Sequence, residues 1–252
     1  MNSKKQCSEW AGGVLMHNNL KFRETAVLSC DARTLVEKIT GNVMLSLGPA
    51  EIFSDERPTY RPSDSEDDLA PIDILYGCYD RSALRITIFA KNIEADASKF
   101  SDGPDDLLTV VRIHQYAHAT VHLGIHNGYV TSRLKELGPD GATDWESFRS
   151  KRDQAFSVID EGSHEFLAQA ITWACIRNDR SHRIERTFLA LEKRQNEWYK
   201  LSPELKECAP LANWGNVLRT IQGDLRAFRM PPFALADGLK ELVLQSGKKD
   251  RA

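Results

Sequence analysis

The sequence predicts an α+β fold, with a small antiparallel or mixed sheet first and a mostly helical region after it. Before residue 100, a run that alternates apolar and polar residues follows a cluster of turn residues, as in a half-buried strand. After residue 100, apolar residues recur at helical spacing. Strand and helix patterns do not alternate along the chain, which argues against a doubly wound parallel sheet.

The first elements are short and end in an acidic loop. Residues 32–40 predict a helix that Gly41 ends, and residues 43–47 (VMLSL) predict a strand. Residues 54–71 contain three prolines, many acids and almost nothing apolar, which predicts a loop. We therefore divide the chain into an N-terminal segment, residues 1–70, with a mobile acidic loop, and a domain of residues 71–252.

A β-hairpin is predicted next. Two apolar runs, Ile72–Tyr79 and Leu84–Ile93, flank the turn residues 80–82. In the second run Leu84, Ile86 and Ile88 alternate with polar residues, so one face of this strand is expected to be buried.

Long helices fill the rest of the chain. The first is expected from about Asp105 to His126, because Pro104 and two acids suit a helix start and Asn127-Gly128 a stop. A second is expected from about residue 145 or 148 to 177. The tail, residues 183–245, is predicted to be mostly helical. Its breaks are expected at Pro203, Pro210 and Pro231-Pro232.

Composition excludes several classes of protein. The 252 residues are 41% hydrophobic and 27% charged, with a formal net charge of −3, so no nucleic-acid partner is expected. The five cysteines form no CxxC pair, which argues against a cysteine zinc site and suits a reducing, cytoplasmic compartment. The N-terminus lacks the apolar stretch of a secretory signal, and no run is long and apolar enough for a membrane span.

Four histidines at a regular spacing are the first candidates for a functional site. His114, His118, His122 and His126 are each four residues apart, so successive rings lie one helical turn apart and rotate by about 40°. His114 and His118 point the same way and can share a small ion. His122 is expected to pack or to orient a ligand, and His126 is assigned no chemistry.

The histidine pair lies in the motif H-Q-Y-A-H. In the zinc-hydrolase signature H-E-x-x-H, two histidines bind zinc and the glutamate takes a proton from the zinc-bound water. Gln115 occupies that glutamate position and is the candidate catalytic residue. A third metal ligand is expected from a later helix. Glu165 is the first choice, Glu161 the second and His164 a weaker one.

Residues 110–124 (VVRIHQYAHATVHLG) and 165–169 (EFLAQ) resemble the zincin metallopeptidases with a glutamate as third ligand, the gluzincins. The resemblance covers roughly residues 72–176. It implies a zinc ion held by His114, His118 and Glu165, a peptide or protein substrate, and alignment of that substrate along the strand at 84–93. The C-terminal helices are then free to complete the core, cover the cleft or bind a protein regulator.

Gln115 leaves the function open. Glutamine is no general base at neutral pH, and a positioned base contributes about 10²–10⁴ in rate, so a peptidase with this sequence is expected to be nearly inactive. Either glutamine replaces an original glutamate, which we favour, or the protein is a pseudopeptidase that binds without cutting. A hydrolase acting on a non-peptide substrate is a third, weaker alternative.

Overall fold

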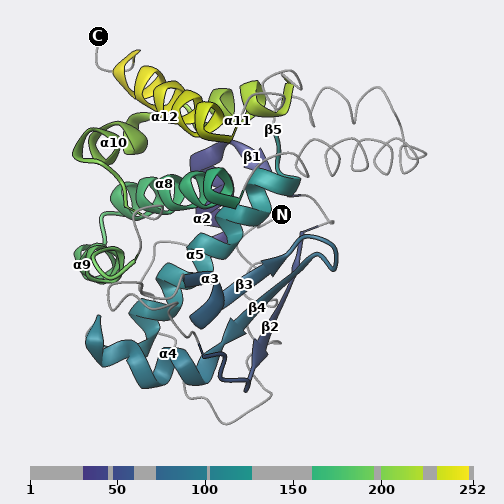
Figure 1. Cartoon of the computed structure of the whole chain (residues 1–252), viewed down its shortest axis with the longest axis vertical. Helices are drawn as coiled ribbons and strands as arrows, with labels where there is room; N and C mark the ends of the chain where they lie inside the picture. The colour runs from purple at the N-terminus through teal and green to yellow at the C-terminus, as the bar shows by residue number, and fades with distance from the viewer. Residues whose placement is uncertain are drawn as a thin grey trace, which may run out of the picture.

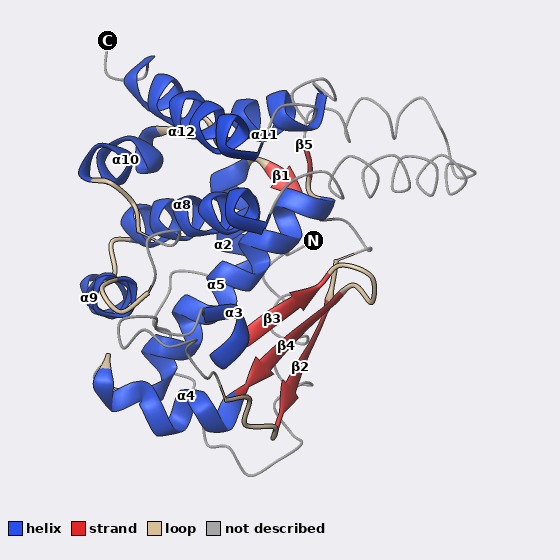
Figure 2. Ribbon diagram, in the orientation of Figure 1, coloured by secondary structure: helices blue, strands red, loops and turns tan. Residues whose placement is uncertain are grey.

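The computed structural model describes residues 31–44, 48–59, 72–100, 103–126, 161–195, 200–223 and 232–249. A long helix, α5 (Pro104–Leu123), runs between a small mixed sheet on one side and a group of helices on the other (Figure 1). It contacts strands β3 (Gly77–Asp80) and β4 (Arg85–Phe89), as well as four α-helices described below. This arrangement confirms the predicted α+β class (Figure 2).

The sheet has the order β2-β4-β3. Strand β2 (Ala50–Ser54) is parallel to the central strand β4, whereas β3 is antiparallel to it, with Gly77 opposite Ile88. The hairpin is confirmed, but both predicted strands were too long. Ile72–Leu75 forms the short helix α3, and Ala90–Asp96 forms α4, because Phe89 and Ala90 are both buried and end the alternation.

Contacts between α3 and α4 hold the ends of the hairpin. The Tyr76 hydroxyl donates to the Asp96 carboxylate at 3.0 Å, and the Asn92 amide donates to the Leu75 carbonyl at 2.9 Å. These contacts fix the direction in which β3 leaves α3, and so the position of β3 beside α5.

The helix predicted at residues 32–40 is confirmed as α2 (Ala32–Thr40). The Asp31 side chain caps its first turn by accepting from Thr34 N, and Gly41 ends it in the left-handed region at φ 64°. The strand expected at 43–47 is described only as β1 (Asn42–Val43), and residues 45–47 lie outside the described residues. Strand β1 pairs antiparallel with β5 (Ile125–His126).

Helix α5 starts as predicted but ends earlier. The Gly124 N–H donates to the Thr120 carbonyl, and the chain then becomes extended and enters β5, so residues 125–126 are strand and not helix. Sixteen of the twenty residues of α5 are buried because elements pack on all sides of it. That burial places polar α5 side chains, including the histidine pair, away from bulk water.

The second long helix is α8 (Glu161–Asp179), which packs against α5; its predicted start lies outside the described residues. The predicted helical tail is confirmed where it is described. It contains α9 (His182–Glu192), α10 (Pro203–Cys208), the 3₁₀ turn η5 (Ala209–Leu211), α11 (Trp214–Gly223) and α12 (Pro232–Lys249). Pro203 and Pro232 are first helical residues, so these prolines begin helices as well as interrupt them.

The core lies around α5 and α8. Leu107, Val111, Ile113, Leu167 and Ile171 are among its fully buried members. Helix α2 contacts both α5 and α8, and β2 pairs with β4, so the described part of residues 1–70 packs against the predicted domain of residues 71–252. No described helix has the length and apolar character needed to cross a membrane.

Candidate metal centre

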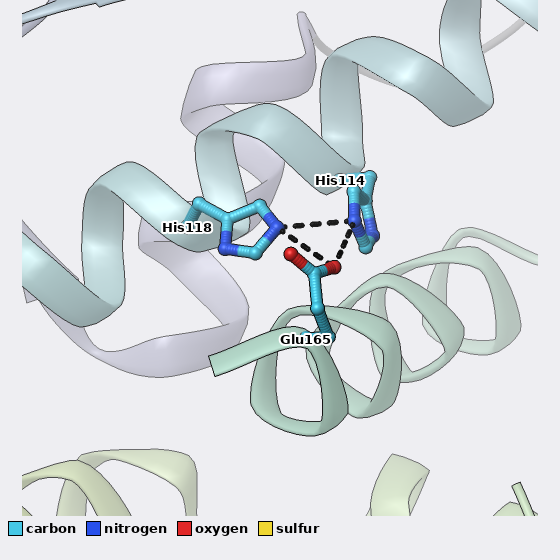
Figure 3. Close-up of side chains that lie close together, drawn as sticks. All are labelled: His114, His118 and Glu165. Carbon is cyan, nitrogen blue, oxygen red and sulfur yellow. Dashed lines mark hydrogen bonds and ion pairs between the residues drawn. The ribbon is translucent and has the colours of Figure 1, made fainter. Parts of the chain in front are cut away.

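His114, His118 and Glu165 converge between α5 and α8 (Figure 3). The Nε2 atoms of the two histidines are 3.1 Å apart, and Glu165 Oε2 lies 3.4 Å from His114 Nε2 and 3.3 Å from His118 Nε2. The three residues lie together because the histidines are one turn apart on α5 and α8 packs across that turn. Among the described residues they form a group that could hold a metal ion.

Burial and hydrogen bonding fit a bound cation. His114 is fully buried, and only 7% of His118 and 8% of Glu165 is exposed. Within the described part of the chain, the buried Glu165 Oε2 has no hydrogen-bond partner. A buried carboxylate oxygen is costly unless a positive charge or a donor satisfies it, and a metal ion between these three atoms would do so.

Gln115 lies at the predicted general-base position but binds the sheet. It is fully buried, and its Nε2 donates to the Gly77 carbonyl at 3.3 Å. Just before β3, the neighbouring Tyr76 carbonyl accepts from Phe89 N on β4. Because carbonyls alternate along a strand, the Gly77 carbonyl faces the edge of β3 away from β4. Gln115 therefore joins the metal-site helix to β3, the edge strand of the sheet among the described residues.

Gly77 allows this close approach. A Cβ atom at residue 77 would lie 2.9 Å from Val111 Cγ1 and 3.1 Å from the Thr87 carbonyl oxygen. Any larger residue would push β3 away from α5 and lengthen the Gln115 hydrogen bond.

Two more histidines lie beside the candidate ligands. The His164 ring stacks on His118 with ring centres 6.3 Å apart. Burial, then the charges of His118, Arg81 and His122, lowers the pKa of His164 well below its usual range, so its ring is neutral at neutral pH. His122 Nδ1 lies 2.8 Å from the Tyr79 hydroxyl, which supports the expected orienting or packing role of His122.

The sequence did not identify Tyr79 or Thr172 as part of this region. Tyr79 is two residues after Gly77 on β3, so the strand alternation could have placed both on the face toward α5. Thr172 lies 3.5 Å from His114 Nδ1 and is two helical turns after Glu165. Neither residue carries a motif of its own, and only the packing of β3 and α8 on α5 reveals them.

The other predicted candidates are placed as follows. Glu161 begins α8, but its side chain lies outside the described residues, so this alternative ligand stays a prediction. His126 lies in β5, with its side chain also outside them.

Comparisons with known proteins give no relative of this chain. No family model matches it, and neither a curated protein nor a solved structure matches it significantly. The class that the fold and the site define is thus a helical α+β protein with a buried His-His-Glu group able to hold a metal ion.

Proposed function

We propose that His114, His118 and Glu165 hold a zinc ion in a site of the metallopeptidase type, and that the chain acts on a peptide or protein. The observation that carries the proposal is the distance between the three candidate ligand atoms, 3.1, 3.4 and 3.3 Å. Tetrahedral zinc, with bonds of about 2.0–2.1 Å, separates its ligands by about 3.3–3.4 Å. A six-coordinate ion with the same bond lengths separates adjacent ligands by only about 2.8–3.0 Å.

The ligand set suits a catalytic site better than a closed structural one. Structural zinc sites use four protein ligands, whereas catalytic sites use three and leave one position for water or substrate. Within the described residues, the group contains three ligands. A zinc ion held there would polarise a carbonyl group and lower the pKa of a bound water.

A peptide substrate is supported by the position of β3, which is an edge strand of the sheet among the described residues. An extended peptide can add to such an edge through backbone hydrogen bonds. The edge strand next to the site is β3, whereas β4, expected from the sequence to align the substrate, is central and paired on both sides. That expectation was wrong, because the sequence pattern does not show that β2 pairs with the far edge of β4.

The candidate ligands, β3 and Gln115 together determine whether the chain would bind or hydrolyse such a substrate. His114, His118 and Glu165 would hold the ion between two helices, and β3 packs against the helix that carries the two histidines. Gln115 supplies an amide where a hydrolase needs a base, and that amide donates to Gly77 instead of accepting a proton. Hydrolysis by the present sequence is therefore expected to be slow.

The test is the Gln115→Glu variant. We expect peptide hydrolysis to rise by about 10²–10⁴ with unchanged zinc content, because the carboxylate can accept a proton from water. We also expect the free energy of unfolding to fall by about 1–2 kcal/mol, since the Gly77 carbonyl loses its donor. Gln115→Ala is the control: it removes the same hydrogen bond and adds no base. Equal activity of the two variants on a broad peptide library would remove the peptidase assignment.

A second candidate function is binding of a polypeptide without hydrolysis. The hydrogen bond from Gln115 to Gly77 favours it, because a glutamate carboxylate at residue 115 would face a carbonyl oxygen without a proton to share. In that case Gln115→Glu loses stability, gains no hydrolysis and still binds zinc. The same pair of variants therefore separates the two functions.

A further inference from the structure

The two ring nitrogens of His114 face different surroundings. Its Nε2 points toward His118 and Glu165, whereas its Nδ1 lies 3.5 Å from the Thr172 hydroxyl on α8. Thr172 is fully buried, and its hydroxyl also donates to the Ala168 carbonyl at 2.7 Å.

The geometry of the two Thr172 contacts bears on where the hydrogens lie. A carbonyl oxygen only accepts, so the hydroxyl hydrogen of Thr172 points toward Ala168 and a lone pair of Oγ1 points toward His114. The contact with His114 is then favourable only if Nδ1 carries the ring hydrogen. A neutral imidazole has a single N–H, so Nε2 keeps the lone pair that a metal ion requires.

We propose that Thr172 is a positioning residue that selects the Nδ1–H tautomer of His114 and thereby raises the affinity of the site for metal. The choice of zinc as the ion rests on the proposed function. Thr172 follows Glu165 by seven residues, two helical turns along α8, and so lies on nearly the same face. Helix α8 thus supplies one ligand and also orients a ligand that belongs to α5.

The first test compares zinc affinity, measured by competition with a chelator, in variants of the full chain. Thr172→Val removes the hydroxyl at nearly constant size, and we expect zinc to bind about 10-fold or more weakly. Thr172→Ser keeps the hydroxyl and is expected to stay within about threefold of the wild type. Thr187→Val is the matched control, since buried Thr187 likewise donates to the carbonyl four residues earlier, at 3.1 Å, but lies on α9.

The second test reads the tautomer of His114 directly by nitrogen-15 NMR on the metal-free chain. At a pH of about 8.5, where an ordinary imidazole is neutral, we expect Nδ1–H in the wild type and a shift toward Nε2–H in Thr172→Val. The same tautomer in both proteins, equal zinc affinities, or equal losses in the Val and Ser variants would overturn the inference. A wild type that binds no zinc would refute the proposed function. In that case the His114 tautomer, compared between the wild type and Thr172→Val, still tests the role of Thr172.

Discussion

Asp106 shows how a single buried charge holds two helices together. It lies in the first turn of α5 and is fully buried. The Arg183 guanidinium on α9 donates to both of its carboxylate oxygens, with Nη2–Oδ1 at 2.6 Å and Nε at 3.1 Å from each oxygen. The paired geometry satisfies a carboxylate that water does not reach, and it fixes α9 against the start of the metal-site helix.

We therefore predict that Arg183→Met lowers the free energy of unfolding by about 2 kcal/mol, because it leaves the Asp106 carboxylate buried without its partner. Urea denaturation measures the change. Lys240→Met is the control, since the pair that Lys240 forms with Asp237 at 3.8 Å is exposed, and this variant is expected to match the wild type. Equal stabilities of the two variants would show that the buried pair is not needed.

At the scale of elements, the end of α2 depends on backbone geometry alone. Gly41 has φ 64°, and among the described residues, its chain neighbours aside, no atom lies within 4 Å of the position that a Cβ would take. Gly238 on α12 is equally open but has ordinary helical geometry. Because neither position is crowded, the two glycines differ in backbone conformation, and their comparison isolates the cost of a left-handed backbone.

Gly41→Ala is expected to lower the free energy of unfolding by about 1 kcal/mol, because alanine is strained in the left-handed region. Gly238→Ala is expected to raise it by about 0.5–1 kcal/mol, because alanine is the better helix former. Thermal or urea unfolding of the two variants measures both changes in the free energy of unfolding, the expected loss in Gly41→Ala and the expected gain in Gly238→Ala. A destabilised Gly238→Ala together with a neutral Gly41→Ala would contradict this account of the two helices.

The elements also show which features a sequence can predict. Helical spacing alone predicts that His114 and His118 lie on the same face of α5. Pro104 and the two acids after it predict where α5 starts. The approach of Glu165 depends on how α8 crosses α5, so the sequence could rank Glu165 but not place it. The partner of Gln115 lies 38 residues away on β3, and no local pattern indicates it. The end of β4 at Phe89 was missed because Ala90 begins a helix within an apolar run.

At the scale of the whole molecule, the site joins the two helices around which the core is built. His114 and His118 belong to α5 and Glu165 to α8, and both helices also contact α2 and α9. A metal ion held by all three side chains binds the folded chain and not the unfolded one. Metal binding is therefore expected to add to the stability of the whole fold.

We predict that zinc raises the melting temperature and that a chelator lowers it. At a zinc concentration 100 times the dissociation constant, the gain in the free energy of unfolding is about 2.7 kcal/mol. Differential scanning calorimetry on the full chain measures the shift. His182→Ala should keep it, because His182 is 92% exposed and lies on α9 outside the site. A shift that persists in His118→Ala would place the ion elsewhere.

The most direct test of the central claim is the metal content of the purified chain, measured by mass spectrometry with the Glu165→Gln variant beside it. Glutamine keeps the shape of the side chain but removes the charge that compensates the ion. We predict about one zinc per chain in the wild type and in His182→Ala, and little or none in Glu165→Gln. An absence of metal from the wild type after growth with zinc, or equal zinc in Glu165→Gln, would contradict the assignment of His114, His118 and Glu165 as a metal centre.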